Sequence, residues 1–121
     1  MEATTTRTPQ EVFQHHVDVL MAEDLDGIVA DYADDAVFMT PAGVLRGKDG
    51  VRQGFEKLIG DLPGAEWEVP TVLFEGNILL LEWKARSATA KAKADDGIDT
   101  FVFGDGLIHV QTVRYTLTPT G

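Results

Sequence analysis

The chain has 121 residues, 44% of them hydrophobic, which is enough to form one domain with a buried core. Its net charge of −10 argues against nucleic acid or an anionic membrane as a partner, because both need basic patches. The absence of cysteine excludes disulfides and thiolate metal sites. No apolar run is as long as a membrane span and the first residues do not resemble a targeting segment, so we expect a soluble, cytoplasmic protein.

Apolar residues at helical spacing predict three helices, over about residues 9–23, 25–32 and 48–59. The first is preceded by Thr8-Pro9-Gln10-Glu11, which has the form of a capping box with proline in the first turn. Residues 1–7 are expected to form a disordered tail. A brief strand is expected over residues 36–40, between the second and third helices, because Pro41-Ala42-Gly43 follows it.

The second half of the chain is predicted to be sheet, with strands over about residues 65–75, 78–92, 98–103 and 107–117. Two tight-turn sequences, Glu75-Gly76-Asn77 and Gly104-Asp105-Gly106, predict antiparallel hairpins. Asp95-Asp96-Gly97 is predicted to form the remaining turn. We therefore expect a single α+β domain over residues 1–121, in which three N-terminal helices pack on a curved, mostly antiparallel sheet.

Asp99 is the residue that points most directly to a function. In the run Ile98-Asp99-Thr100-Phe101-Val102-Phe103, alternation places Asp99 on the same strand face as Phe101 and Phe103. If these aromatic rings face a core, the carboxyl group must be paired or protonated near neutral pH, because an ionised carboxylate is costly in apolar surroundings. Two interpretations stay open: an acid lining an apolar pocket, or an aspartate at the wet end of an edge strand.

Several segments resemble ketosteroid isomerase. Asp24-Leu25-Asp26-Gly27-Ile28-Val29-Ala30, Tyr32-Ala33-Asp34-Asp35-Ala36 and Pro41-Ala42-Gly43 resemble its helical front half, and Ile98-Asp99-Thr100-Phe101 resembles its inner-strand acid segment. The resemblance implies the nuclear transport factor 2-like fold, shared with SnoaL-like polyketide cyclases, limonene epoxide hydrolase and scytalone dehydratase. In that fold a strongly bent sheet and three helices form a cone around an apolar pocket. Fold alone does not determine function.

The resemblance also aligns three catalytic positions. The strand acid of the isomerase matches Asp99, its tyrosine position falls on His16, and its base position falls on Thr40. A threonine hydroxyl is no useful base near pH 7, so steroid isomerisation is not expected. We predict that His16 and Asp99 form a catalytic acid–base pair, in which the carboxylate raises the pKa of the imidazole. The alternative is that His16, next to His15 on an amphipathic helix, is an ordinary core residue.

The remaining candidate residues are expected to line the pocket and bind the substrate; they are Tyr32, Phe38, Thr40, Phe55, Trp83, Phe101, Gln111 and Tyr115. The two tyrosines and the glutamine offer hydrogen-bond donors that could hold a ligand oxygen. Two alternatives stay open here. Gln111 could merely satisfy Asp99 inside the core, and the Trp83 indole could fill the cavity instead of lining it.

Other chemistries lack their sequence signals. The histidines do not have zinc-site spacing and no phosphate-binding glycine loop occurs, so no metal and no cofactor are expected. Arg86 and Arg114 fall on outer strand faces, which leaves no counterpart for the arginine of the limonene epoxide hydrolase relay. Two classes remain: a cofactor-free isomerase, cyclase or dehydratase acting on a small hydrophobic carbonyl compound, or a non-catalytic domain that binds a small molecule or dimerises. A homodimer is expected through the outer sheet face, where Leu80, Ile108 and Val110 would otherwise meet water.

Overall fold

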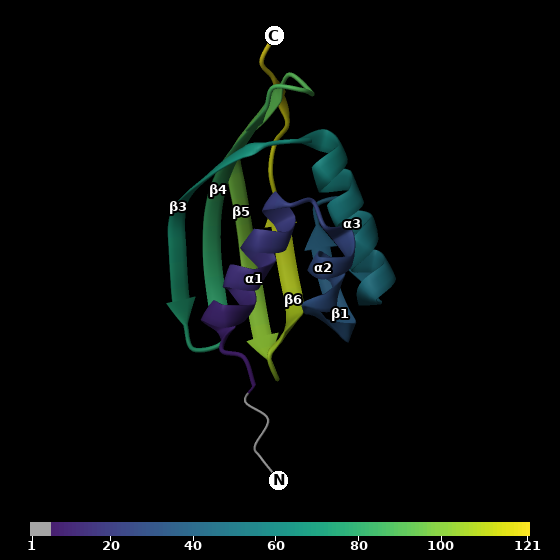
Figure 1. Cartoon of the computed structure of the whole chain (residues 1–121), viewed down its shortest axis with the longest axis vertical. Coiled ribbons are helices and arrows are strands. Elements are labelled where there is room, and N and C mark those ends of the chain that lie inside the picture. Colours follow the sequence, from purple (N-terminus) through teal and green to yellow (C-terminus); the bar gives the residue numbers. More distant parts are fainter. Residues whose placement is uncertain (1–5) are drawn as a thin grey trace.

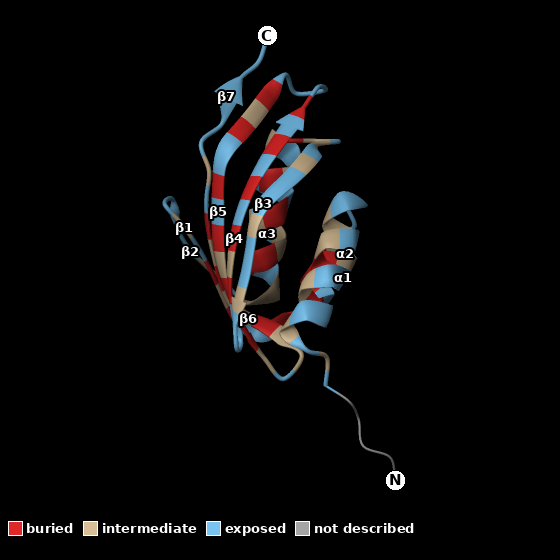
Figure 2. Ribbon diagram, turned by 90° about the vertical axis from the view of Figure 1, so that its left-hand side faces the viewer, coloured by how far each residue is buried: buried red, intermediate tan, exposed pale blue. Residues whose placement is uncertain are grey.

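Three helices cover one face of a single curved sheet in the computed structural model, which describes residues 6–121 (Figures 1 and 2). The helices are α1 (Pro9–Met21), α2 (Leu25–Ala30) and α3 (Gly47–Asp61). The strands are β1 (Tyr32–Thr40), β2 (Gly43–Arg46), β3 (Glu66–Glu75), β4 (Ile78–Ser87), β5 (Ala92–Gly104), β6 (Leu107–Arg114) and β7 (Thr118–Pro119). They lie in the order β2-β1-β6-β5-β4-β3, with β7 beside β5, and β1 and β6 are parallel whereas the other neighbours are antiparallel. The predicted α+β class and helix-on-curved-sheet architecture are confirmed.

The predicted helices are present, with small differences at their ends. The capping box at the start of α1 is complete, because Glu11 N donates to Thr8 Oγ1 (3.1 Å) and Thr8 N donates to Glu11 Oε1 (2.8 Å). The second helix ends at Ala30, earlier than expected, because Tyr32 already belongs to the sheet beside Ile108 of β6. None of the helices within residues 6–121 combines the length and apolar character of a membrane span.

The predicted N-terminal tail differs from the structure at Arg7. Residues 1–5 lie outside the described part of the chain, so the expectation stays untested there. Arg7 is hydrogen-bonded: its guanidinium donates to the buried Asp31 carboxylate (2.9 Å) and to the Gly106 carbonyl oxygen (2.7 Å). These bonds hold the segment before α1 against the end of α2 and the β5–β6 turn.

The prediction of a turn at Asp95-Asp96-Gly97 is wrong. The turn lies at residues 88–91, and β5 continues through Gly97, which pairs with Trp83 of β4. A Cβ atom at Gly97 would lie 2.2 Å from the Trp83 ring. Glycine is therefore needed at position 97, because the indole lies directly across its backbone. The sequence alone does not distinguish such a glycine from one that is needed in a turn.

The inner face of the sheet carries the buried core residues, and the prediction for Ile108 of β6 is wrong. Leu79, Leu81 and Trp83 of β4 are buried, as their alternation predicts. Ile108 was expected on the outer face, but it is fully buried. The register between β5 and β6 shifts between Val102 and Phe103, and this irregularity turns Ile108 inward.

Gly97→Ala tests the close approach of the indole. We expect the added methyl group to displace Trp83 and lower the free energy of unfolding by about 2 kcal/mol, the usual scale for overpacking a core. Gly60→Ala in α3 is the matched control, because a Cβ there meets nothing within 4 Å and alanine favours helix. Urea denaturation of both variants measures the effect, and equal stabilities would contradict the prediction.

A homodimer through the outer sheet face remains a prediction. Ile78, Val102, Val110 and Val37 are paired across four neighbouring strands, and each lies next to a buried residue, so they form an apolar row on the outer face. That face of the sheet carries no helix (Figure 2). We expect dimers in sedimentation at micromolar concentration and monomers for Ile78→Asp. Val72→Asp is the control, because Val72 is equally exposed (46%) but lies on the other side of the sheet. A monomeric wild-type protein would contradict the prediction.

Candidate active site

Asp99 lies in β5, between β4 and β6, with its side chain on the face that the helices cover. The residue is 6% exposed. Its Oδ1 accepts a hydrogen bond from Trp83 Nε1 and its Oδ2 accepts one from Gln111 Nε2, both 3.0 Å long. Burial raises the pKa of Asp99 to about 7, although the two hydrogen bonds favour the ionised form. The structure thus places this carboxyl group inside, and the alternative of a wet strand end no longer applies.

Gln111 connects Asp99 to a second buried group. Its amide oxygen accepts a hydrogen bond from the Tyr32 hydroxyl, while its amide nitrogen donates to Asp99. Tyr32 and Gln111 are each almost completely buried. Both ends of the amide are therefore used within the protein, which favours the interpretation that Gln111 satisfies Asp99.

His16 lies on the buried side of α1, where it is 3% exposed. Its ring is surrounded by the aromatic side chains of Phe13, Tyr32, Phe55 and Phe101, with centroids 5.4 to 6.4 Å away. Burial lowers the pKa of His16 to about 4, against the attraction of Asp31. The predicted rise of this pKa is wrong, because the loss of hydration among four rings outweighs the nearby carboxylate. Neither Asp99 nor any other described residue is hydrogen-bonded to the buried His16 Nδ1.

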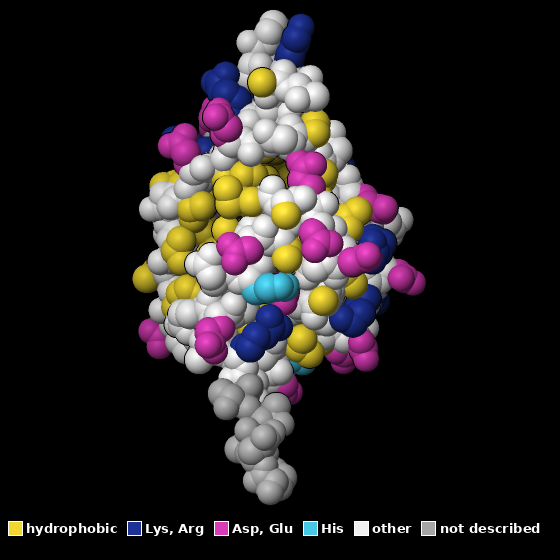
Figure 3. Space-filling model, in the orientation of Figure 1, with side chains coloured by type: hydrophobic (Ala, Val, Ile, Leu, Met, Phe, Trp, Pro, Cys, Tyr) yellow, Lys and Arg dark blue, Asp and Glu magenta, His cyan; other side chains and the backbone are white. Residues whose placement is uncertain are grey.

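His16 and Asp99 nevertheless line one cavity, of about 150 Å³, which we call the Asp99 cavity. Its walls come from α1, α3, β3 and β4, and they include Phe13, Leu20, Phe55, Leu58, Trp67 and Trp83. Figure 3 shows hydrophobic side chains gathered around a hollow between α1 and β3. The surroundings of the two titratable groups are therefore mostly apolar.

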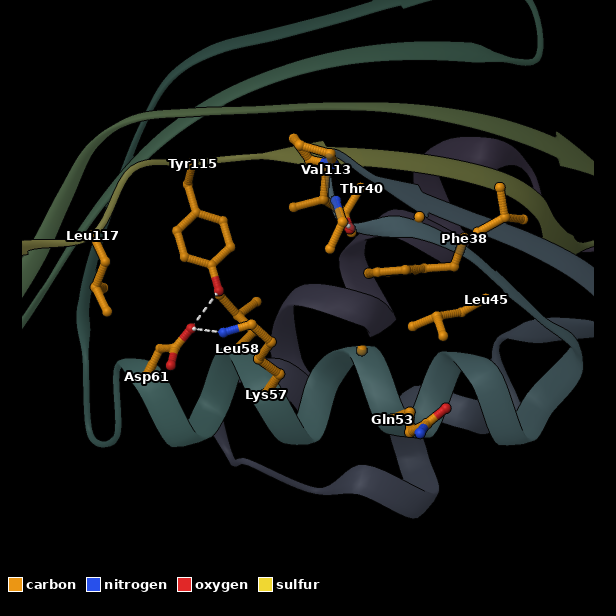
Figure 4. Close-up of a pocket in the computed structure, with 15 residues that line it drawn as sticks. Phe38, Thr40, Leu45, Gln53, Lys57, Leu58, Asp61, Val113, Tyr115 and Leu117 are labelled. Atoms are coloured by element: carbon orange, nitrogen blue, oxygen red, sulfur yellow. Dashed lines mark hydrogen bonds and ion pairs between the residues drawn. The ribbon is translucent and has the colours of Figure 1, made fainter.

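A second and larger hollow, of about 650 Å³, lies between α3, the β1–β2 hairpin and the end of β6 (Figure 4). We call it the α3 groove. At one end the Tyr115 hydroxyl and the Lys57 ammonium both donate to Asp61 Oδ2, at 2.8 and 2.9 Å. Burial, followed by the bond to Asp61, raises the pKa of Tyr115 well above its usual value. The phenol is thus a neutral donor that is already engaged with α3.

The predicted site residues divide among three places. His16, Phe55, Trp83 and Asp99 line the Asp99 cavity; Phe38, Thr40 and Tyr115 line the α3 groove; Tyr32, Phe101 and Gln111 are buried beside them. Trp67 and Leu58 also line the cavity, although neither is among the residues predicted for the pocket. The alternation of side chains along β3 could have indicated that Trp67 points inward, and the helical spacing of apolar residues in α3 could have indicated the same for Leu58.

The cavity can supply proton transfer and hydrogen bonds. Within residues 6–121, no three histidine, aspartate or glutamate side chains are grouped as metal ligands would be. Near pH 7 the Asp99 carboxyl group can be either protonated or ionised, because its pKa is about 7, and the His16 imidazole is uncharged. A carboxyl group whose pKa lies near the working pH can both accept and release a proton at a small free-energy cost.

Comparisons with known proteins agree with this architecture. Residues 13–110 match the family model described as the SnoaL-like domain. An NTF2-like protein from Cytophaga hutchinsonii has a TM-score of 0.73 at 17% identity, covering 94% of this chain and 95% of that one. A SnoaL-like protein from Burkholderia thailandensis has a TM-score of 0.70 at 23% identity, covering 94% and 99%. An LEH-like epoxide hydrolase from M. tuberculosis has a TM-score of 0.68 at 18% identity, covering 89% and 82%. No curated protein sequence matches the chain.

The two buried titratable groups should affect folding stability in opposite directions. Folding raises the pKa of Asp99 from 3.8 to about 7, so the folded state binds this proton more tightly and the stabilisation is lost as pH rises over that range. Folding lowers the pKa of His16 from 6.5 to about 4, so its contribution is lost as pH falls over that range. Each effect amounts to roughly 3–4 kcal/mol at most.

Urea denaturation between pH 4 and 6.5 can separate the two effects. In Asp99→Asn the His16 effect stands alone, so we expect the free energy of unfolding to rise with pH more steeply than in the wild type. In His16→Phe only the Asp99 effect remains, so we expect the free energy of unfolding to fall as pH rises, relative to the wild type. Parallel curves for the three proteins would contradict the two pKa shifts.

Proposed function

Because this chain belongs to the family of SnoaL-like domains, we propose that it is a cofactor-free acid–base enzyme acting on a small hydrophobic carbonyl compound in the Asp99 cavity. The observation that carries the proposal is the buried Asp99 carboxyl group, whose pKa of about 7 lies at the pH where it would work. The reaction class is isomerisation, cyclisation or dehydration. Each of these can begin with removal of a proton from a carbon next to a carbonyl group.

In the proposed step, the Asp99 carboxylate removes a proton from the carbon adjacent to the substrate carbonyl. The electron pair of the broken C–H bond forms the carbon–carbon double bond of an enolate, and negative charge moves to the carbonyl oxygen. The protonated Asp99 then returns the proton to carbon, at the same or a conjugated position. A carboxylate with a pKa of about 7 is a stronger base than one near 4, and the Trp83 and Gln111 donors hold it in one orientation.

His16 is proposed to bind the carbonyl oxygen as a neutral ring. A pKa of about 4 keeps the imidazole uncharged at pH 7. Nδ1 is enclosed by protein atoms, so Nε2 is the ring nitrogen that can meet a ligand in the cavity. In the tautomer protonated at Nε2, this nitrogen donates to the substrate oxygen, and the bond would strengthen as negative charge develops on that oxygen.

The structure gives less support to the mechanisms of better-known members of the fold. Thr40 lines the α3 groove, and its hydroxyl accepts a hydrogen bond from Ala42 N (3.1 Å). It is therefore not positioned to act with Asp99 in the place of the ketosteroid isomerase base. No arginine is among the residues that line the Asp99 cavity, which argues against an arginine relay of the epoxide hydrolase kind.

A non-catalytic ligand-binding domain is the second candidate. The observation that favours it is the closed chain of hydrogen bonds from Tyr32 through Gln111 and Asp99 to Trp83, in which each side chain is already satisfied. Such a chain can stabilise a core without taking part in chemistry. Its partner would still be a small hydrophobic molecule, since the cavity walls are mostly apolar.

Proton exchange on a simple ketone separates the two candidates. Cyclohexanone is a suitable probe, and loss of its α-deuterium into water is followed by NMR. We expect Asp99→Asn to slow the enzymatic exchange by about 100-fold or more, because it removes the base, and we expect the wild-type rate to rise with pH and level off above pH 7. Asp35→Asn, at an exposed carboxyl group, is the control and should leave the rate unchanged.

Two results would count against the enzymatic proposal. Equal exchange rates in the wild type and Asp99→Asn would exclude Asp99 as the base. Saturable binding of cyclohexanone without any exchange would favour the binding domain.

A further inference from the structure

The Asp99 cavity and the α3 groove are separated by side chains. Leu58 of α3 lines both hollows. Next to it, Trp83 from the cavity packs against Tyr115 from the groove, with ring centroids 5.4 Å apart. We call Leu58, Trp83 and Tyr115 the partition.

Two members of the partition are held by hydrogen bonds and the third is not. Trp83 donates to Asp99, and its ring lies over Gly97. The Tyr115 ring reaches from the sheet toward α3, where its hydroxyl donates to Asp61 (Figure 4). Leu58 contributes only its volume, so it is the member that can be changed without breaking a polar contact.

The two hollows differ in the ligands that they can hold. An apolar cavity of about 150 Å³ is known to hold one benzene ring, and the Asp99 cavity has this size. The α3 groove, at about 650 Å³, is large enough for a drug-sized molecule. A compound with two fused rings is larger than the Asp99 cavity, so its second ring must either lie at the mouth between α1 and β3 or enter the groove, and the partition closes the path into the groove.

We propose that the partition restricts the Asp99 site to single-ring compounds and that Leu58 sets this limit. The preferred substrate class is then a monocyclic ketone or a compound of similar size, with its oxygen toward His16 and Asp99. The inference takes the location of the site from the proposed function, but the size limit does not depend on catalysis. The partition can therefore be tested by binding alone.

Phenol and 2-naphthol are suitable probes, because they share a hydroxyl group and differ by one ring. Calorimetry gives the Kd of phenol, and displacement of phenol gives that of 2-naphthol, so 2-naphthol bound in the groove alone does not contribute. We expect the wild type to bind 2-naphthol at least about tenfold more weakly than phenol. In Leu58→Ala we expect the 2-naphthol Kd to fall by about tenfold or more, while the phenol Kd changes less than about threefold.

Ile59→Ala is the matched control, since Ile59 is the next aliphatic residue of α3 and lines neither hollow. It should keep the wild-type preference. If Leu58→Ala does not fold, Leu58→Val should shift the preference in the same direction by a smaller factor.

Wild-type protein that binds both compounds equally, or neither, would overturn the proposal, as would folded Leu58 variants with unchanged preference. A preference for phenol over 2-naphthol that Leu58→Ala reduces, without ketone exchange, would retain the partition and reject the proposed enzyme.

Discussion

The hydrogen bonds from Trp83 and Gln111 to Asp99 are the contacts on which the site depends. A carboxyl group this deeply buried needs donors, and it receives one from each neighbouring strand. Both donors are uncharged, so they orient the carboxyl group without forcing it to stay ionised. A lysine or arginine in either place would hold the pKa of Asp99 low and leave a weak base. Neutral donors and apolar walls together keep the pKa near 7.

Strand pairing positions each part of this arrangement. In the ladder, Trp83 faces Gly97 and Gln111 faces Phe101, and each of these partners lies two residues from Asp99. A shift of one residue in either pairing would turn the donors to the outer face. The missing side chain at Gly97 gives the indole its room. The helices then close the space, with His16 supplied by α1 and Leu58 by α3.

Much of this arrangement could be predicted because it follows from local patterns. Helical spacing and the capping box located α1, and alternation identified the inner face of β4. Alternation also placed Asp99 with Phe101 and Phe103, and the resemblance to ketosteroid isomerase implied a cone of three helices on a bent sheet around an apolar pocket. The errors arose where a local signal has two meanings. Asp95-Asp96-Gly97 reads as a turn although Gly97 serves the packing of Trp83, and alternation misplaces Ile108 because the β5–β6 register shifts.

Residue order along the chain thus established the class of fold, the faces of most elements and the inward position of one acid, since these depend on the period of each element. The pKa of His16 and the division of the pocket depended on how distant segments pack. An imidazole loses its charge according to how many rings surround it, and Phe13, Tyr32, Phe55 and Phe101 come from four separate elements. Whether one hollow or two forms depends on where Leu58, Trp83 and Tyr115 meet. Hydration and volume are properties of the packed interior, and residue spacing does not encode them.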